Sequence, residues 1–154
     1  MKRFLKPEEE ARLLAAIERA ESKTSGEIRV HIEGRCPGDP LPAARRRFAR
    51  LGMSGTAERN GVLFYVAARD RKFSVVGDEG IHLHVGDPFW NRLRDGLRER
   101  FARGEFAAGL EQAIGEVAEE LSHAFPRRSG DVNELPDSIS YSGPESGGDE
   151  DESL

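Results

Sequence analysis

The sequence predicts a small α/β domain in which helices cover both faces of a mixed sheet. Residues 28–33 (IRVHIE) alternate between apolar and polar side chains, which is typical of a strand. Two apolar runs, 62–67 and 73–76, flank the short polar link 68–71 and indicate a β-hairpin. Amphipathic segments with apolar residues three and four positions apart precede and follow these strands. The predicted architecture is therefore a three-layer α/β/α sandwich.

Four helices are expected from their apolar spacing and their end signals. Pro7 and the glutamates after it suit the first turn of a helix that runs to residue 21. A second helix is expected over 43–51, after a proline-rich loop. Asp87 and Pro88 predict the start of a third helix, and a fourth covers 105–124.

The order of the elements predicts how the strands pair. Residues 28–33 and 62–67 are joined through a helix, which favours a parallel pair connected by a right-handed crossover. The strand at 73–76 follows a short link and is expected to be antiparallel to its neighbour. Residues 81–85 alternate and predict a short further strand or extended link.

Composition divides the 154 residues into a folded domain, 1–128, and an acidic tail, 129–154. The tail carries eight acidic residues and no lysine or arginine, so the remaining residues have a net charge of about +3. Few apolar residues anchor this tail, and we expect it to be largely disordered.

Several protein classes are disfavoured by the same totals. No apolar run is long enough to span a bilayer, and the basic N-terminus meets three glutamates before any apolar stretch, unlike a secretion signal. Arg45–Arg47 has no interleaved aromatic residues, so a solvated helix face is favoured over nucleic-acid binding. A single cysteine excludes an intramolecular disulfide. We expect a cytoplasmic protein without membrane insertion.

One end of the predicted sheet gathers oxygen-bearing side chains. Two parallel strands start there and the hairpin strand ends there, which brings together Glu27, Asn60, Asp78 and Glu79, with Asp87 following closely. Carboxylate and amide oxygens suit a hard cation, so these five residues are candidate ligands for Ca²⁺ or Mg²⁺. The alternative is that Asn-Gly and Asp-Glu-Gly are ordinary turn formers.

Short motifs in a fixed order along residues 5–126 resemble the TPM domain family. The matching residues are Thr24-Ser25-Gly26-Glu27-Ile28, Val30, Phe48, Leu51-Gly52, Asn60-Gly61-Val62-Leu63, Arg71, Gly77-Asp78-Glu79-Gly80-Ile81, Trp90, Phe101, Gly104, Gly109 and Phe125-Pro126. Asn133–Asp137 resembles a tail segment of short family members.

The resemblance implies a non-catalytic interaction or assembly module that binds a divalent cation and a protein partner. The alternative it implies is a weak metal-dependent acid phosphatase acting on phosphomonoesters. A phosphatase would need Asp78 or Asp70 beside an arginine, and Asp70 is expected at the opposite end of the hairpin. The chain has no phosphate-binding loop of the nucleotide-binding type, so the binding module is the favoured hypothesis.

Overall fold

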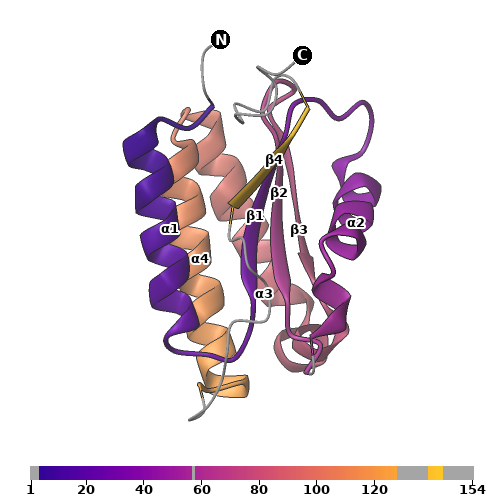
Figure 1. The fold of residues 1–154 in the computed structure, drawn as a ribbon, viewed down its shortest axis with the longest axis vertical. Helices are drawn as coiled ribbons and strands as arrows, with labels where there is room; N and C mark the ends of the chain where they lie inside the picture. The colour runs from indigo at the N-terminus through magenta and orange to yellow at the C-terminus, as the bar shows by residue number, and fades with distance from the viewer. Residues whose placement is uncertain (1–3, 57, 128–138, 144–154) are drawn as a thin grey trace.

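The computed structural model describes residues 4–56, 58–127 and 139–143, which form four helices and four strands around one sheet (Figure 1). The elements are α1 (Pro7–Glu21), β1 (Ile28–Glu33), α2 (Pro40–Arg50), the 3-10 turn η1 (Met53–Gly55), β2 (Val62–Ala67), β3 (Lys72–Gly77), α3 (Glu79–Ala102), α4 (Phe106–Ala124) and β4 (Ile139–Ser142).

The sheet has the strand order β3-β2-β1-β4 and is mixed, as the sequence predicts. Strands β1 and β2 are parallel, with Ile28 opposite Val62. Strands β2 and β3 form the antiparallel hairpin, in which Val62 lies opposite Gly77. The starts of β1 and β2 and the end of β3 therefore lie at one end of the sheet, which is where the candidate ligands stand.

Helices cover both faces of the sheet, so the three-layer prediction is confirmed. Helices α1 and α4 pack together on one face, and α2 lies on the other (Figure 1). The larger core joins Ile28, Val30 and Ile32 of β1 to apolar residues of α1, α3 and α4, among them the fully buried Trp90. The smaller core lies under α2 and includes Phe48 and Met53. No helix among the described residues has the length and apolar character that a membrane span requires.

Helix α3 begins earlier than the sequence predicts. Residues 81–85 are helical, so the expected strand or extended link is wrong. Asp78 is the N-cap, and Gly86, with φ 75° and ψ 171°, breaks the helical geometry where the sequence predicts a helix start. The alternation of Ile81 and Leu83 was misleading because Ile81 is buried while Leu83 is almost fully exposed, as on a helix surface.

Helix α2 also begins earlier, at Pro40 rather than at residue 43. Asp39 caps it by accepting a hydrogen bond from the Leu41 N–H at 3.0 Å. Prolines at the first helical positions lose no helical hydrogen bond, so the proline-rich stretch that suggests a loop is a helix start instead.

Strand β4 adds an element that the sequence analysis does not predict within 129–154. Residues Ile139–Ser142 pair in parallel with β1. Ser140 and Ser142 lie within hydrogen-bonding distance of the two ring nitrogens of His31, at 2.7 and 2.9 Å. His31 is buried, which together with the charge of Arg47 lowers its pKa to about 4. The face of β1 expected to be wetter is buried at Arg29 and His31, and residues 129–138 and 144–154 of the tail lie outside the described residues.

Gly77 is expected to be essential for packing at the end of β3. A Cβ atom there would lie 2.6 Å from two ring carbons of Trp90 and 3.1 Å from Ile81 Cγ2. Because Trp90 is fully buried and cannot retreat, Gly77→Ala should lower the free energy of unfolding by about 1–3 kcal/mol. The measurement is urea unfolding followed by fluorescence.

Gly115→Ala is the matched control for that substitution. Gly115 is exposed within α4, and an added Cβ would meet no atom within 4 Å. The control should gain roughly 0.5–1 kcal/mol from helix propensity. Equal effects of the two substitutions would contradict the packing described for Gly77.

Candidate functional site

Four of the predicted ligands lie at one end of the sheet, which we call the carboxylate corner: Glu27, Asn60, Asp78 and Glu79. Backbone hydrogen bonds join the segments directly. The Val62 N–H donates to Glu27 O at 2.8 Å, and the Asp78 N–H donates to Gly61 O at 2.9 Å. The sheet ladder thus continues into the three loops and fixes them side by side.

Asp78 is the most constrained side chain of the corner. Its Oδ1 accepts a hydrogen bond from the Glu79 N–H at 2.8 Å, which caps α3. Arg59 donates from Nε to Oδ2 at 2.8 Å and from Nη2 to Oδ1 at 2.9 Å, forming a two-point ion pair. The Asp78 side chain is 6% exposed and that of Arg59 is 45% exposed. A buried carboxylate is therefore balanced by a guanidinium that faces solvent.

Glu79 lies on the solvent side of the same arginine. Its Oε2 is 3.8 Å from Arg59 Nη2, and its side chain is 74% exposed. The hydrogen bonds that Arg59 donates to Asp78 raise the pKa of the guanidinium, and the charge of Glu79 adds to this effect. Arg59 also has a positive φ of 52°, an uncommon conformation for a residue with a side chain. The guanidinium of Arg59 is thus the counter-charge of both carboxylates, and the backbone of Arg59 is held in a restricted conformation.

Close backbone packing holds the loop before β2 against the start of α3. The Gly80 N–H donates to Arg59 O at 2.9 Å. A Cβ on Gly80 would lie 2.4 Å from Glu58 O and 2.5 Å from Arg59 O, so glycine is required for this approach.

Polar side chains extend the corner toward the loop before β1. Ser25 Oγ donates to Glu58 Oε1 at 2.9 Å, and Asn60 Nδ2 lies 3.4 Å from Ser25 Oγ. Asn60 is 2% exposed, so its amide is a buried polar group rather than a surface turn residue. The loops before β1 and before β2 are thereby linked through side chains as well as through the sheet.

Glu27 is buried beside Glu21, the last residue of α1. Burial, the negative charge of Glu27 and a hydrogen bond between the two carboxyl groups together raise the pKa of Glu21 to about 7, although the Ile28 N–H and Arg127 act in the opposite direction. Two neighbouring carboxylates repel each other, so the ionisation of one of these groups disfavours the ionisation of the other.

Asp87 is separated from the carboxylate corner along the chain by the first turns of α3. It is exposed and lies just beyond the break at Gly86, eight positions after Glu79. Within residues 4–56, 58–127 and 139–143, no three acidic, histidine or cysteine side chains are grouped closely enough to hold a metal ion as they stand.

Sequence reasoning identified the three strand ends but missed several partners in the corner. Glu21, Ser25 and Glu58 were not predicted as site residues. Glu21 stands at a helix end and reaches Glu27 only through the turn between them, so no spacing rule reveals the pair. Arg59 precedes a recognised Asn-Gly turn, and its ion pair with Asp78 depends on the register of β2 and β3.

The fold is that of a small α/β domain with a mixed four-stranded sheet. The family model of the TPM domain matches residues 1–120, and the chain belongs to this family. No curated protein is similar enough to the chain to be matched with it.

Two solved structures resemble the chain. The BA42 protein from the psychrophilic bacterium Bizionia argentinensis, solved by NMR, is 40% identical with a TM-score of 0.84, over 92% of this chain and 98% of that one. The N-terminal domain of the cg2496 protein from Corynebacterium glutamicum has a TM-score of 0.57 at 14% identity, over 88% of this chain and 79% of that one. The second likeness concerns the fold alone.

The raised pKa of Glu21 predicts a specific pH dependence of stability. Between about pH 4.5 and pH 7 the folded protein keeps a proton on Glu21 that the unfolded chain releases, so stability falls as the pH rises through this window. Glu21→Gln removes this loss and should be more stable than the wild type at pH 8 by roughly 1–2 kcal/mol, allowing for solvent screening.

Urea unfolding between pH 5 and pH 8 measures this difference. Glu18→Gln, an exposed position on the same helix, is the control and should follow the wild-type pH dependence. A wild-type-like slope in Glu21→Gln would contradict the assignment.

Proposed function

We propose that this domain is a non-catalytic module that binds a divalent cation, Ca²⁺ or Mg²⁺, at the carboxylate corner and presents the loaded corner to a protein partner. The supporting observation is the exposed guanidinium of Arg59, which is the shared counter-charge of Asp78 and Glu79. A divalent cation placed there would replace one positive charge with two.

The donor set suits a hard cation. Asp78 and Glu79 offer carboxylate oxygens, Asn60 offers an amide oxygen, and Glu27 adds a further carboxylate at the same sheet end. Calcium accepts six to eight oxygens in flexible geometry, including backbone carbonyls and water, so it suits loops better than zinc does. Arg59 is the competitor that must leave before Asp78 can bind an ion.

Displacement of Arg59 would transmit the effect of cation binding to the loops at the protein surface. In the sequence, Arg59 lies between Glu58 and the buried Asn60, and the Glu58 carboxylate accepts a hydrogen bond from the Ser25 hydroxyl. A released Arg59 would free its positive-φ backbone and alter the loop joined to Gly80. Cation binding would therefore change the shape and charge of all three loops together, which is the kind of change that a partner can recognise.

The phosphatase alternative has less support from the geometry. Asp78 already caps α3 and accepts both hydrogen bonds from Arg59, so it is poorly placed to attack a phosphate. Asp70 lies at the other end of the hairpin, where it accepts a hydrogen bond from the Cys36 N–H at 2.7 Å. Phosphatase activity stays a prediction of the family resemblance.

Calcium titration followed by amide NMR tests the proposal. At millimolar Ca²⁺ we expect shifts centred on Asn60, Asp78 and Glu79. Asp78→Asn should weaken binding by roughly tenfold or more, because it removes a charged ligand. Arg59→Gln should strengthen binding severalfold, because it removes the competing charge.

Asp95→Asn is the matched control for the titration. Asp95 lies on the exposed surface of α3 and pairs with Arg98 at 3.1 Å, away from the corner. Its substitution should leave calcium affinity unchanged. No shifts at the corner, or equal affinities of the Asp78→Asn and Asp95→Asn variants, would refute the site.

A further inference from the structure

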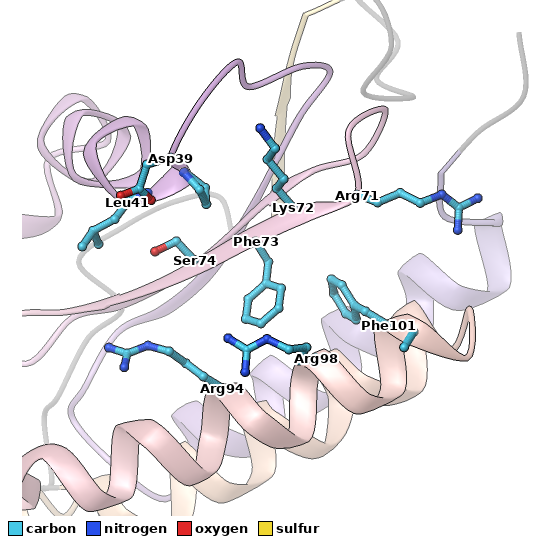
Figure 2. A pocket seen from close by; sticks show the side chains of 11 residues that line it. Asp39, Leu41, Arg71, Lys72, Phe73, Ser74, Arg94, Arg98 and Phe101 are labelled. Atoms are coloured by element: carbon cyan, nitrogen blue, oxygen red, sulfur yellow. The ribbon is translucent and has the colours of Figure 1, made fainter.

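A cavity of about 770 Å³ lies beside β3, between the start of α2 and the second half of α3 (Figure 2). Its wall includes Lys72, Phe73 and Ser74, three successive residues of β3. Successive side chains of a strand point to opposite faces of the sheet, and Figure 2 shows Phe73 directed toward α3 while Lys72 and Ser74 point the other way. A cavity that touches all three must run along the edge of the strand.

The edge in question is free of a partner strand. β3 is the terminal strand in the order β3-β2-β1-β4, so within the described part of the chain its outer backbone groups are paired with no other strand. An open edge of this kind offers a row of N–H donors and C=O acceptors to an extended chain. Edge addition is a common way for a sheet to bind a peptide.

The cavity is strongly basic. Lys72, Arg94 and Arg98 line it, as does Arg71, whose guanidinium lies over the Phe106 ring at 5.4 Å from its centre. The carboxylate in the lining is that of Asp39, which caps α2. Lys72 donates to the carbonyls of Cys36 and Gly38, at 3.0 and 2.8 Å, and both of these acceptors are neutral. The cavity therefore has an excess of positive charge.

The two arginines of α3 are also differently engaged. Arg94 donates to the amide oxygen of Asn91 at 3.2 Å, a neutral partner, and Arg98 has the solvent-exposed partner Asp95. A basic residue on an edge strand is explained by its role in discouraging aggregation, so such a residue alone does not indicate a binding site. Here two of the four cations come from a neighbouring helix, and both line the same cavity.

The spacing of the cations fits an extended acidic chain. Figure 2 shows α3 running alongside β3, with Arg94 and Arg98 one helical turn apart and both at the cavity. Four helical residues rise by about 6 Å. Alternate residues of a strand are roughly 6.6 Å apart. Carboxylates at alternate positions of a strand added to β3 would therefore meet Arg94 and Arg98 in turn.

The floor of the cavity is apolar. Phe73 and Phe101 make an edge-on contact with ring centres 5.2 Å apart, and Leu41 contributes from α2. Apolar surface gives the side chains of a peptide somewhere to bury between the charges.

We propose that this cavity along the edge of β3, called the groove below, binds an extended acidic segment of a partner protein, added to β3 as a further strand. The acidic side chains would face Arg94 and Arg98, and the backbone would pair with the outer edge of β3. The groove lies at the start of β3, whereas the carboxylate corner lies at its end, so this proposal does not depend on cation binding.

The probe is a fluorescein-labelled peptide of sequence Glu-Val-Glu-Thr-Glu-Val-Glu, followed by fluorescence anisotropy with the full chain. The double charge reversal Arg94→Glu with Arg98→Glu should weaken binding by roughly tenfold or more. The control double variant, Arg45→Glu with Arg92→Glu, makes the same change of net charge at exposed positions outside the cavity and should change affinity less than about twofold. Thermal unfolding verifies that each variant is folded, and Arg94→Gln with Arg98→Gln provides a milder second variant.

Two further readouts test strand addition itself. Amide hydrogen exchange of β3 should slow when the peptide binds, and a peptide N-methylated at alternate residues should lose affinity, because it lacks the donors that the edge requires. Equal binding by the two double variants would overturn the proposal. Equal binding of the N-methylated peptide, or complete displacement by millimolar inorganic phosphate, would also overturn it and indicate a small-anion site instead.

Discussion

The two-point ion pair between Asp78 and Arg59 holds together the end of the sheet on which the proposed function rests. The same carboxylate caps α3, while its backbone N–H continues the β2–β3 ladder through Gly61. A helix start, a strand end and the loop before β2 are thus joined at one buried acid. Because the guanidinium stays exposed, the pair combines a fixed anion with a replaceable cation. That asymmetry makes cation exchange physically reasonable at Asp78.

The corner stores unfavourable charge as well as favourable contacts. Glu21 and Glu27 lie together with a pKa of about 7 on Glu21, so their joint ionisation opposes folding near neutral pH. Natural proteins retain such conflicts where function requires them. The basic groove at the start of β3 has the opposite sign, so the two ends of this strand differ in charge and in the ligands that suit them.

Much of the fold follows from the sequence, and the failures have identifiable causes. Period-two alternation correctly predicted β1, and the hairpin was recognised from its apolar runs. The same alternation was misleading at Ile81, because Asp78 caps a helix that begins before it. Strand β4 was not predicted because four residues, two of them serines, carry little strand signal. Its pairing with β1 depends on His31 and on the open edge of β1, both of which are far from it in the sequence. The convergence of Asn60 and Asp78 was predictable from topology, whereas the Arg59 ion pair required the register.

The most direct test of the central claim is the NMR signal of the Arg59 side-chain Nε–H group during a calcium titration. If a cation takes the place of the guanidinium at Asp78, this proton should shift and exchange faster with water as Ca²⁺ is added, in step with the Asp78 amide. An Arg59 Nε–H signal that stays protected and unshifted at saturating Ca²⁺ would show that the ion pair persists, and would contradict the account.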